Sequence, residues 1–143
     1  MKQSNYPFAF EESAYRFESV SVNKRIRKAV LLTRSLNDSL FNLALMDVTN
    51  EGHLSDEVQS RNGDVREVLA TVFQIIDHFL MRNPDIIVGF SGNDDRRHRL
   101  YRIAITQALS EISGKFEIYG NKRGQVVLFE PNQEYNAYYI KRL

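Results

Sequence analysis

The densest group of residues that could carry chemistry is a run of four arginines within seven residues, at the start of a predicted helix. The free backbone N–H groups of a helix N-terminus attract anions, and a guanidinium group binds a phosphate or carboxylate through two parallel hydrogen bonds. At 100° per residue, positions 96, 99 and 102 spread over about 120° and share one broad face. The pattern predicts an anion-binding site made by Ser91, Asn93, Arg96, Arg97, Arg99 and Arg102.

The turn before this helix also contains two acidic residues, Asp94 and Asp95, which allow a second interpretation. They would cap the helix and pair with nearby arginines, and the result would be a solvated charged face without a ligand. Exposed ion pairs of this kind contribute about 0–1 kcal/mol each. Cations at a helix N-terminus also oppose the helix dipole, a cost that an anionic ligand would offset. Both interpretations stay open.

A second basic patch is predicted at Arg25, Arg27 and Lys28, in a segment (19–37) with five cations and no acidic residue. A basic sheet with exposed aromatic rings holds single-stranded nucleic acid by charge and base stacking. The aromatic residues that would stack on the bases are Tyr15, Phe17, Tyr135, Tyr138 and Tyr139. Alternatively, the cations keep an edge strand from pairing with other chains, and the rings belong to the core. The net charge of +1 is low for a nucleic-acid-binding protein.

Motifs for catalysis and metal binding are scarce. The segment 53–57 has one histidine and two carboxylates, but no second histidine at metal-ligand spacing. Ser91 lacks the Gly-x-Ser-x-Gly spacing of a hydrolase nucleophile. The absence of cysteine excludes thiolate chemistry. We therefore predict no catalytic residue, no metal site and no cofactor, and an enzyme is the least favoured class.

The elements that position these residues follow from hydrophobic periodicity. Strands are predicted at 14–22, 25–33, 40–48, 85–90, 115–119 and 125–129, with a last, edge-like strand at 135–140. One helix is predicted from residue 65 to Asn83-Pro84, with a capping-box-like start at Asp64 and Glu67, and a second helix ends at Gly114. The order β-β-β-α-β-α-β-β(-β) predicts an α+β fold: a mostly antiparallel sheet with two helices packed on one face.

Length and composition set the broad class of protein. A chain of 143 residues, 43% hydrophobic and 26% charged, is typical of a single globular domain, here residues 1–143. Its apolar runs are too short to cross a membrane, and its N-terminus lacks the apolar core of a secretory signal. Because cysteine is absent, disulfides are excluded. We expect a cytoplasmic protein that does not bind membranes.

Several short motifs carry a family resemblance. They are 6–8 (Tyr-Pro-Phe), 62–64 (Asn-Gly-Asp), 69–72 (Leu-Ala-Thr-Val), 99–103 (Arg-Leu-Tyr-Arg-Ile) and 116–120 (Phe-Glu-Ile-Tyr-Gly). Together they resemble a family of short bacterial proteins, found mainly in Bacteroidetes, that is known as a domain of unknown function. The resemblance covers nearly the whole chain and implies no particular activity, cofactor or catalytic residue.

The function predicted from the sequence is a non-enzymatic anion-binding module, whose partner is a nucleic acid or a phosphorylated ligand. The alternative is a protein-interaction component that self-associates or forms half of a paired bacterial system. For that alternative, the acid-rich stretch 47–67 would meet a basic strand of a neighbouring subunit, and the tyrosine-rich segment 135–143 would suit an interface. An enzyme without a familiar motif is the third class.

Overall fold

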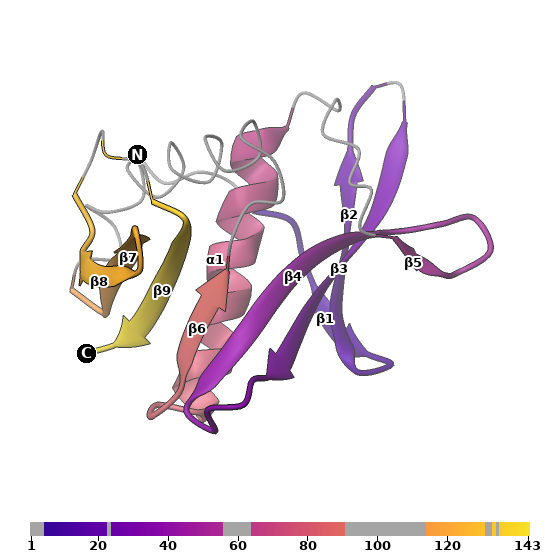
Figure 1. The fold of residues 1–143 in the computed structure, drawn as a ribbon. Coiled ribbons are helices and arrows are strands. Elements are labelled where there is room, and N and C mark those ends of the chain that lie inside the picture. Colours follow the sequence, from indigo (N-terminus) through magenta and orange to yellow (C-terminus); the bar gives the residue numbers. More distant parts are fainter. Residues whose placement is uncertain (1–4, 23, 56–63, 91–113, 131–132, 134) are drawn as a thin grey trace.

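The computed structural model describes residues 5–22, 24–55, 64–90, 114–130, 133 and 135–143. These residues form a nine-stranded sheet, and a long helix lies against one of its faces (Figure 1). In chain order the elements are β1 (Ala9–Glu11), β2 (Ala14–Val20), β3 (Arg25–Arg34), β4 (Leu40–Val48), β5 (Leu54–Ser55), α1 (Val65–Arg82), β6 (Ile87–Phe90), β7 (Phe116–Lys122), β8 (Gln125–Leu128) and β9 (Ala137–Arg142).

The sheet is mostly antiparallel, as predicted. Its strand order is β1-β2-β3-β4-β6-β9-β7-β8, and β5 pairs with β4 outside this path. β4 and β6 are parallel, whereas the other described strand pairs are antiparallel. A parallel pair needs a crossover connection, and α1 lies in the segment that joins β4 to β6. The coarse α+β prediction is therefore confirmed.

The observed strands differ from the prediction at β1, β5 and β9. β1 and β5 were not predicted, because strands of three and two residues are too short to show an alternating pattern. β9 is not an edge strand: it pairs with β6 on one side and β7 on the other. The part of the chain that the structure describes has one helix, and the second predicted helix falls in residues 91–113, outside the described residues.

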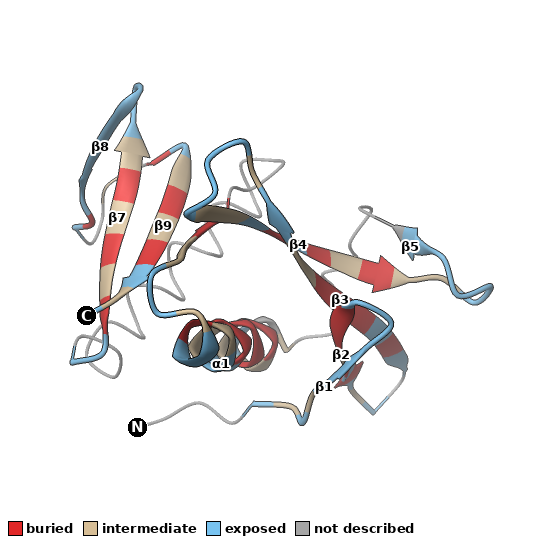
Figure 2. Cartoon of the chain, turned by 90° about the horizontal axis from the view of Figure 1, so that it is seen from below, coloured by how far each residue is buried: buried red, intermediate tan, exposed pale blue. Residues whose placement is uncertain are grey.

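The hydrophobic core lies between α1 and the concave face of the sheet. Figure 2 shows the sheet curving around the helix, with β7 and β9 on one side of it and β2 and β3 on the other. The helix contributes apolar residues at the spacing of a single face, namely Val68, Leu69, Val72, Ile75, Ile76 and Leu80. The sheet contributes alternate residues of its strands, among them Val30, Leu45, Val88, Ile118 and Ile140. The face of the sheet that points away from α1 is called the outer face below.

The start of α1 differs from the predicted capping box. Asp64 is the N-cap residue, but its side chain makes no capping hydrogen bond. Its carboxylate instead accepts hydrogen bonds from the hydroxyls of Tyr6 and Ser19. A carboxylate at this position still interacts favourably with the helix dipole. The helix ends as predicted at Asn83, whose side chain donates to the carbonyl oxygen of Phe79 at 2.9 Å.

Candidate functional site

The predicted anion site lies outside the described residues. Its members, Ser91, Asn93, Arg96, Arg97, Arg99 and Arg102, all fall in residues 91–113. The anion-binding role of this arginine cluster therefore stays a prediction.

The second basic patch is divided between the two faces of the sheet. Register pairs Glu18 with Arg27 and Phe17 with Lys28, so Arg25 and Arg27 lie on the outer face and Lys28 lies on the concave face. Lys28 is 3% exposed, and its Nζ atom is 2.7 Å from Oδ1 of Asp47. Lys28 therefore does not belong to an exposed patch.

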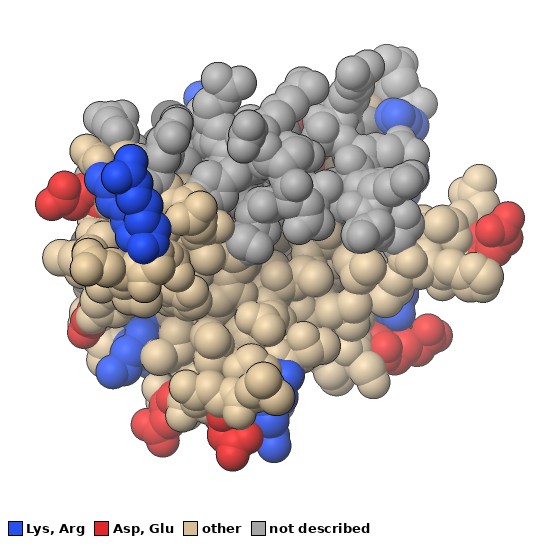
Figure 3. Space-filling model, viewed as in Figure 1, with Lys and Arg blue, Asp and Glu red and all other residues tan. Residues whose placement is uncertain are grey.

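The two arginines on the outer face are exposed, and each has a partner within the chain. Arg25 lies 3.3 Å from the carboxylate of Glu18, on the neighbouring strand. The Nη2 atom of Arg27 donates to the carbonyl oxygen of Thr49 at 2.6 Å. On the side of the molecule that Figure 3 shows, the Lys and Arg side chains of the described residues are scattered rather than gathered in one patch.

The aromatic residues proposed for base stacking are mostly buried. Tyr15, Phe17, Tyr135 and Tyr138 are all less than 8% exposed and belong to the core against α1. Tyr139 is the exception, because its position in β9 places it on the outer face, where its ring covers Gly89. Arg25 and Arg27 thus lie on the face of the sheet opposite to the buried rings, and the predicted stacking surface does not form there. The C-terminal tyrosines at 135 and 138 are likewise core residues rather than an interface.

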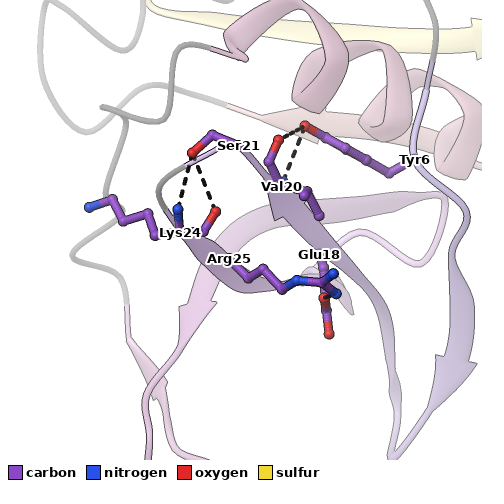
Figure 4. A network of polar contacts seen from close by, with 6 residues as sticks. All are labelled: Tyr6, Glu18, Val20, Ser21, Lys24 and Arg25. Atoms are coloured by element: carbon purple, nitrogen blue, oxygen red, sulfur yellow. Dashed lines mark hydrogen bonds and ion pairs between the residues drawn. The ribbon is translucent and has the colours of Figure 1, made fainter.

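A polar network joins the N-terminal segment, β2 and the start of α1. The hydroxyl of Tyr6 donates to Asp64 and accepts from the backbone N–H of Val20 at 3.3 Å. Figure 4 shows Tyr6 reaching the end of β2, beside the turn where Ser21 contacts the backbone of Lys24. Burial, reinforced by the hydrogen bond to Asp64, raises the pKa of Tyr6 above its ordinary value of 10.0. This network connects Tyr6 and Asp64, which belong to two of the motifs that carry the family resemblance, 6–8 and 62–64.

The most exposed apolar part of the sheet is β8. Among the described strands, β8 pairs only with β7 and ends the sheet. Figure 2 shows it exposed along its length, beyond β7. Val126 is 58% exposed, Val127 36% and Leu128 64%. Natural edge strands are commonly protected from other chains by charged residues or proline, and β8 contains neither.

The hairpin that presents β8 is held by two asparagines. The turn between β7 and β8 is Arg123-Gly124, with φ angles of 54° and 87°. Positive φ at both residues is typical of the type I′ turn, whose twist matches that of the flanking strands. Asn121 Oδ1 accepts from the N–H of Gly124 at 2.9 Å, and Asn136 Oδ1 accepts from the N–H of Arg123 at 3.2 Å. The turn and the start of β8 are therefore fixed on both sides.

An open hollow with positive charge adjoins this hairpin. It has a volume of about 440 Å³ and is lined by Lys122, Arg123, Gln125 and Val127. Lys122 donates to the side-chain oxygen of Gln133 at 3.0 Å. No described carboxylate lies within ion-pair distance of Arg123. The hollow and the exposed strand form one continuous feature, the β8 edge: Lys122 to Leu128.

The described residues contain no other marked chemical site. They include no group of three His, Asp or Glu residues that would hold a metal ion. No described helix has the length and apolar character needed to cross a membrane.

Comparison with known proteins places the chain in a family. A family model described as "Family of unknown function (DUF6934)" matches residues 2–143. The chain belongs to DUF6934. No curated protein and no solved structure matches it. The predicted resemblance to a family of unknown function is confirmed, and the bacterial distribution expected for DUF6934 stays a prediction.

Sequence reasoning missed the β8 edge of this DUF6934 protein. Three consecutive apolar residues in a short strand are typical of a strand buried on both faces, and residues 126–128 fit that pattern. The one local signal was the Lys-Arg-Gly turn, which puts two cations beside an apolar run. Only the strand order shows that the run lies at an edge.

Proposed function

We propose that this DUF6934 protein is a non-enzymatic interaction module that binds an extended polypeptide segment carrying a carboxylate, along the β8 edge. The observation that supports this proposal is an apolar edge strand, unprotected by charge, that adjoins a cationic hollow. Addition of a strand to an exposed sheet edge is a common mode of peptide recognition: main-chain hydrogen bonds give affinity, and alternate side chains give specificity.

The backbone of β8 is oriented for such pairing. The N–H of Phe129 donates to the carbonyl oxygen of Ile118 at 2.9 Å. Hydrogen-bonded and non-hydrogen-bonded residues alternate along an antiparallel ladder. Val127 therefore directs its N–H and carbonyl toward β7, whereas Val126 and Leu128 direct theirs toward the open edge. A partner strand would find two donors and two acceptors there.

Side chains on the outer face extend this edge. Register pairs Leu128 with Tyr119 and Val126 with Asn121, so the two exposed apolar side chains lie on the outer face beside β7. Complete burial of a Val or Leu side chain is worth about 1.5–3 kcal/mol. Because Val126 and Leu128 are more than half exposed, a partner strand would gain a large part of that energy from each.

The cations at the turn define the charge of the partner. Arg123 presents a planar group that binds a carboxylate bidentately, and Lys122 lines the same hollow. Because an edge strand pairs with a polypeptide, the anion of the proposed function is a carboxylate on that polypeptide. A nucleic acid held by stacking on the second basic patch is less well supported, because four of the five rings expected to stack bases are buried. A phosphorylated ligand stays an alternative, since a guanidinium also binds phosphate.

Peptide binding tests the proposal. Labelled eight-residue peptides of alternating valine and threonine would be titrated by fluorescence anisotropy, one with a terminal glutamate pair and one with a lysine pair. A labelled single-stranded RNA and a phosphate-bearing nucleotide would be titrated in parallel. We expect the acidic peptide to bind with a Kd of roughly tens to hundreds of micromolar, more tightly than the basic peptide.

Matched variants locate the binding surface. Val126→Lys, at a side chain 58% exposed, places a charge in the edge, and Met81→Lys makes a similar change at a side chain 61% exposed on α1. We expect Val126→Lys to weaken peptide binding by roughly tenfold or more and Met81→Lys to leave it unchanged. Equal binding by Val126→Lys and the wild type would refute the proposal. Binding of the RNA or the nucleotide, with no binding of either peptide, would instead favour the function predicted from the sequence.

A further inference from the structure

The β8 edge is complementary to itself. We infer that the polypeptide that occupies it is the β8 strand of a second copy of this chain, paired antiparallel about a two-fold axis at Val127. This inference rests on the proposed function and names its partner. It also agrees with the alternative of self-association that the sequence suggested, but it assigns the contact to a different part of the chain.

The register centred on Val127 satisfies both the symmetry and the strand geometry, and it pairs both open residues of β8. Two identical antiparallel strands related by a two-fold axis place residue i opposite residue j with a constant sum of i and j. With Val127 at the axis, Val126 lies opposite Leu128 of the second copy, and Leu128 lies opposite Val126 of the second copy. Both residues direct their backbone groups to the open edge, so each such pair exchanges two hydrogen bonds. The pairing forms four main-chain hydrogen bonds and joins the two sheets into one.

The side chains match in the same register. The Val126 and Leu128 side chains of the two copies lie across from each other on the outer face, and the two Val127 side chains meet on the concave face. All three residues are exposed in the single chain. The four residues of β8 contain no charge, so the pairing brings no like charges together. The opposite end of the sheet differs, because β1 has three residues and ends in Glu11, followed by Glu12.

Charges flanking the strand reinforce the register. Arg123 lies in the turn at the start of β8, and the exposed Glu130 lies two residues beyond its end. The backbone N–H of Glu130 donates to the hydroxyl of Tyr135 at 2.9 Å, which holds its position. In an antiparallel pair the end of one strand lies beside the start of the other, so the pairing brings Glu130 of the second copy to the same end of the interface as Arg123. The two-fold axis repeats this Arg–Glu proximity at the other end.

Oligomeric state is the first test. Sedimentation velocity of the full chain from about 1 to 500 μM would show a concentration-dependent dimer. We expect Val126→Lys to weaken the dimer by at least tenfold, and Met81→Lys, equally exposed on α1, to leave it intact. A dimer that Val126→Lys does not weaken would overturn the inference, because its interface would lie elsewhere.

Cysteine crosslinking tests the register. The chain has no cysteine, so each single substitution introduces the only thiol. Val127→Cys places two thiols in a directly opposed, non-hydrogen-bonded pair, where Cα atoms are about 4.5 Å apart and a disulfide forms readily. Val126→Cys places its thiols two residues out of register, beyond disulfide reach. We expect rapid oxidation to a covalent dimer for Val127→Cys only. Faster crosslinking of Val126→Cys would overturn the register.

Charge exchange tests the flanking pair. Arg123→Glu and Glu130→Arg would each weaken the homodimer, because each places like charges together twice. A mixture of the two variants restores both contacts and should favour the heterodimer over either homodimer. A mixture that shows no such preference would overturn the Arg–Glu contact.

The outcomes separate this inference from the proposed function. A chain that stays monomeric throughout, yet binds the acidic peptide, would overturn self-pairing and leave the proposed function standing with another polypeptide as its partner. A chain that neither dimerises nor binds the peptide would overturn both.

Discussion

Replacing Gly120 with alanine tests the packing of the Tyr135 ring over β7. An ideal Cβ atom at Gly120 would lie 2.2 Å from Cδ1 and 2.5 Å from Cγ of Tyr135, so the ring would have to move. Tyr135 is 4% exposed, and its ring packs against Phe129 and Tyr138 with centroids 5.4 and 5.9 Å away. Its hydroxyl also accepts the N–H of Glu130.

The expected loss of stability follows from these contacts. Overpacking a core costs about 1–3 kcal/mol, and a displaced ring also loses a hydrogen bond worth about 1 kcal/mol. We expect Gly120→Ala to lower the free energy of unfolding by about 2–4 kcal/mol, and Tm by roughly 10 °C for a chain of this size. Urea denaturation followed by circular dichroism measures the first quantity, and a thermal scan measures the second.

A matched substitution and a double mutant control this prediction. Gly114 has no atom within 4 Å of an added Cβ, so Gly114→Ala should change the free energy of unfolding by less than about 1 kcal/mol. In a Tyr135→Leu background the clash is relieved, and Gly120→Ala should cost less than it does in the wild type. A Gly120→Ala variant as stable as Gly114→Ala, or a strictly additive double mutant, would refute the packing argument.

Three further predictions concern the stability of variants at single residues. Tyr6→Phe removes a donor to the Asp64 carboxylate and should lower the free energy of unfolding by about 1.5–3 kcal/mol. Because the pKa of Tyr6 is raised, this difference between wild type and variant should persist up to pH 10 and close as the pH rises through the raised pKa. A difference that stays constant to pH 12 would contradict the hydrogen bond from Tyr6 to Asp64. Ser13 has a φ of 65° in the β1–β2 turn, so Ser13→Gly should stabilise the protein by about 1 kcal/mol in urea denaturation, and a loss of stability would contradict the strain argument. Lys28→Met removes the cation that lies 2.7 Å from the buried carboxylate of Asp47 and should cost about 3–5 kcal/mol. The double variant Lys28→Met/Asp47→Leu should recover most of this loss, and a double variant as unstable as the single one would contradict the pairing.

Local patterns in the sequence were sufficient to predict most of the secondary structure. The apolar stripe of α1 repeats at the helical period, and its end at Asn83-Pro84 follows from the restriction that proline places on the preceding residue. The alternation of β2, β3 and β4 predicted their bounds to within a few residues. Membership in a family of unknown function was also predictable, because the short motifs are read directly from the chain.

The candidate site depended on contacts between residues far apart in the sequence. The β9 strand lies between β6 and β7 because its backbone pairs with both, and no local pattern specifies which strands will be neighbours. That order makes β8 an edge, so the apolar run 126–128 forms an exposed surface.

The charged residues show the same division between local pattern and tertiary structure. Alternation along β3 is enough to place Lys28 on the opposite face from Arg25 and Arg27. The burial of Lys28 against Asp47 depends on the tertiary structure, because Asp47 belongs to the next strand. The same holds for the hydrogen bond that Asp64 accepts from Tyr6, 58 residues away, instead of capping α1 with its side chain. The physical reason is the range of the interactions: backbone periodicity acts within a few residues, whereas burial and charge pairing are set by which strands and segments the fold brings together.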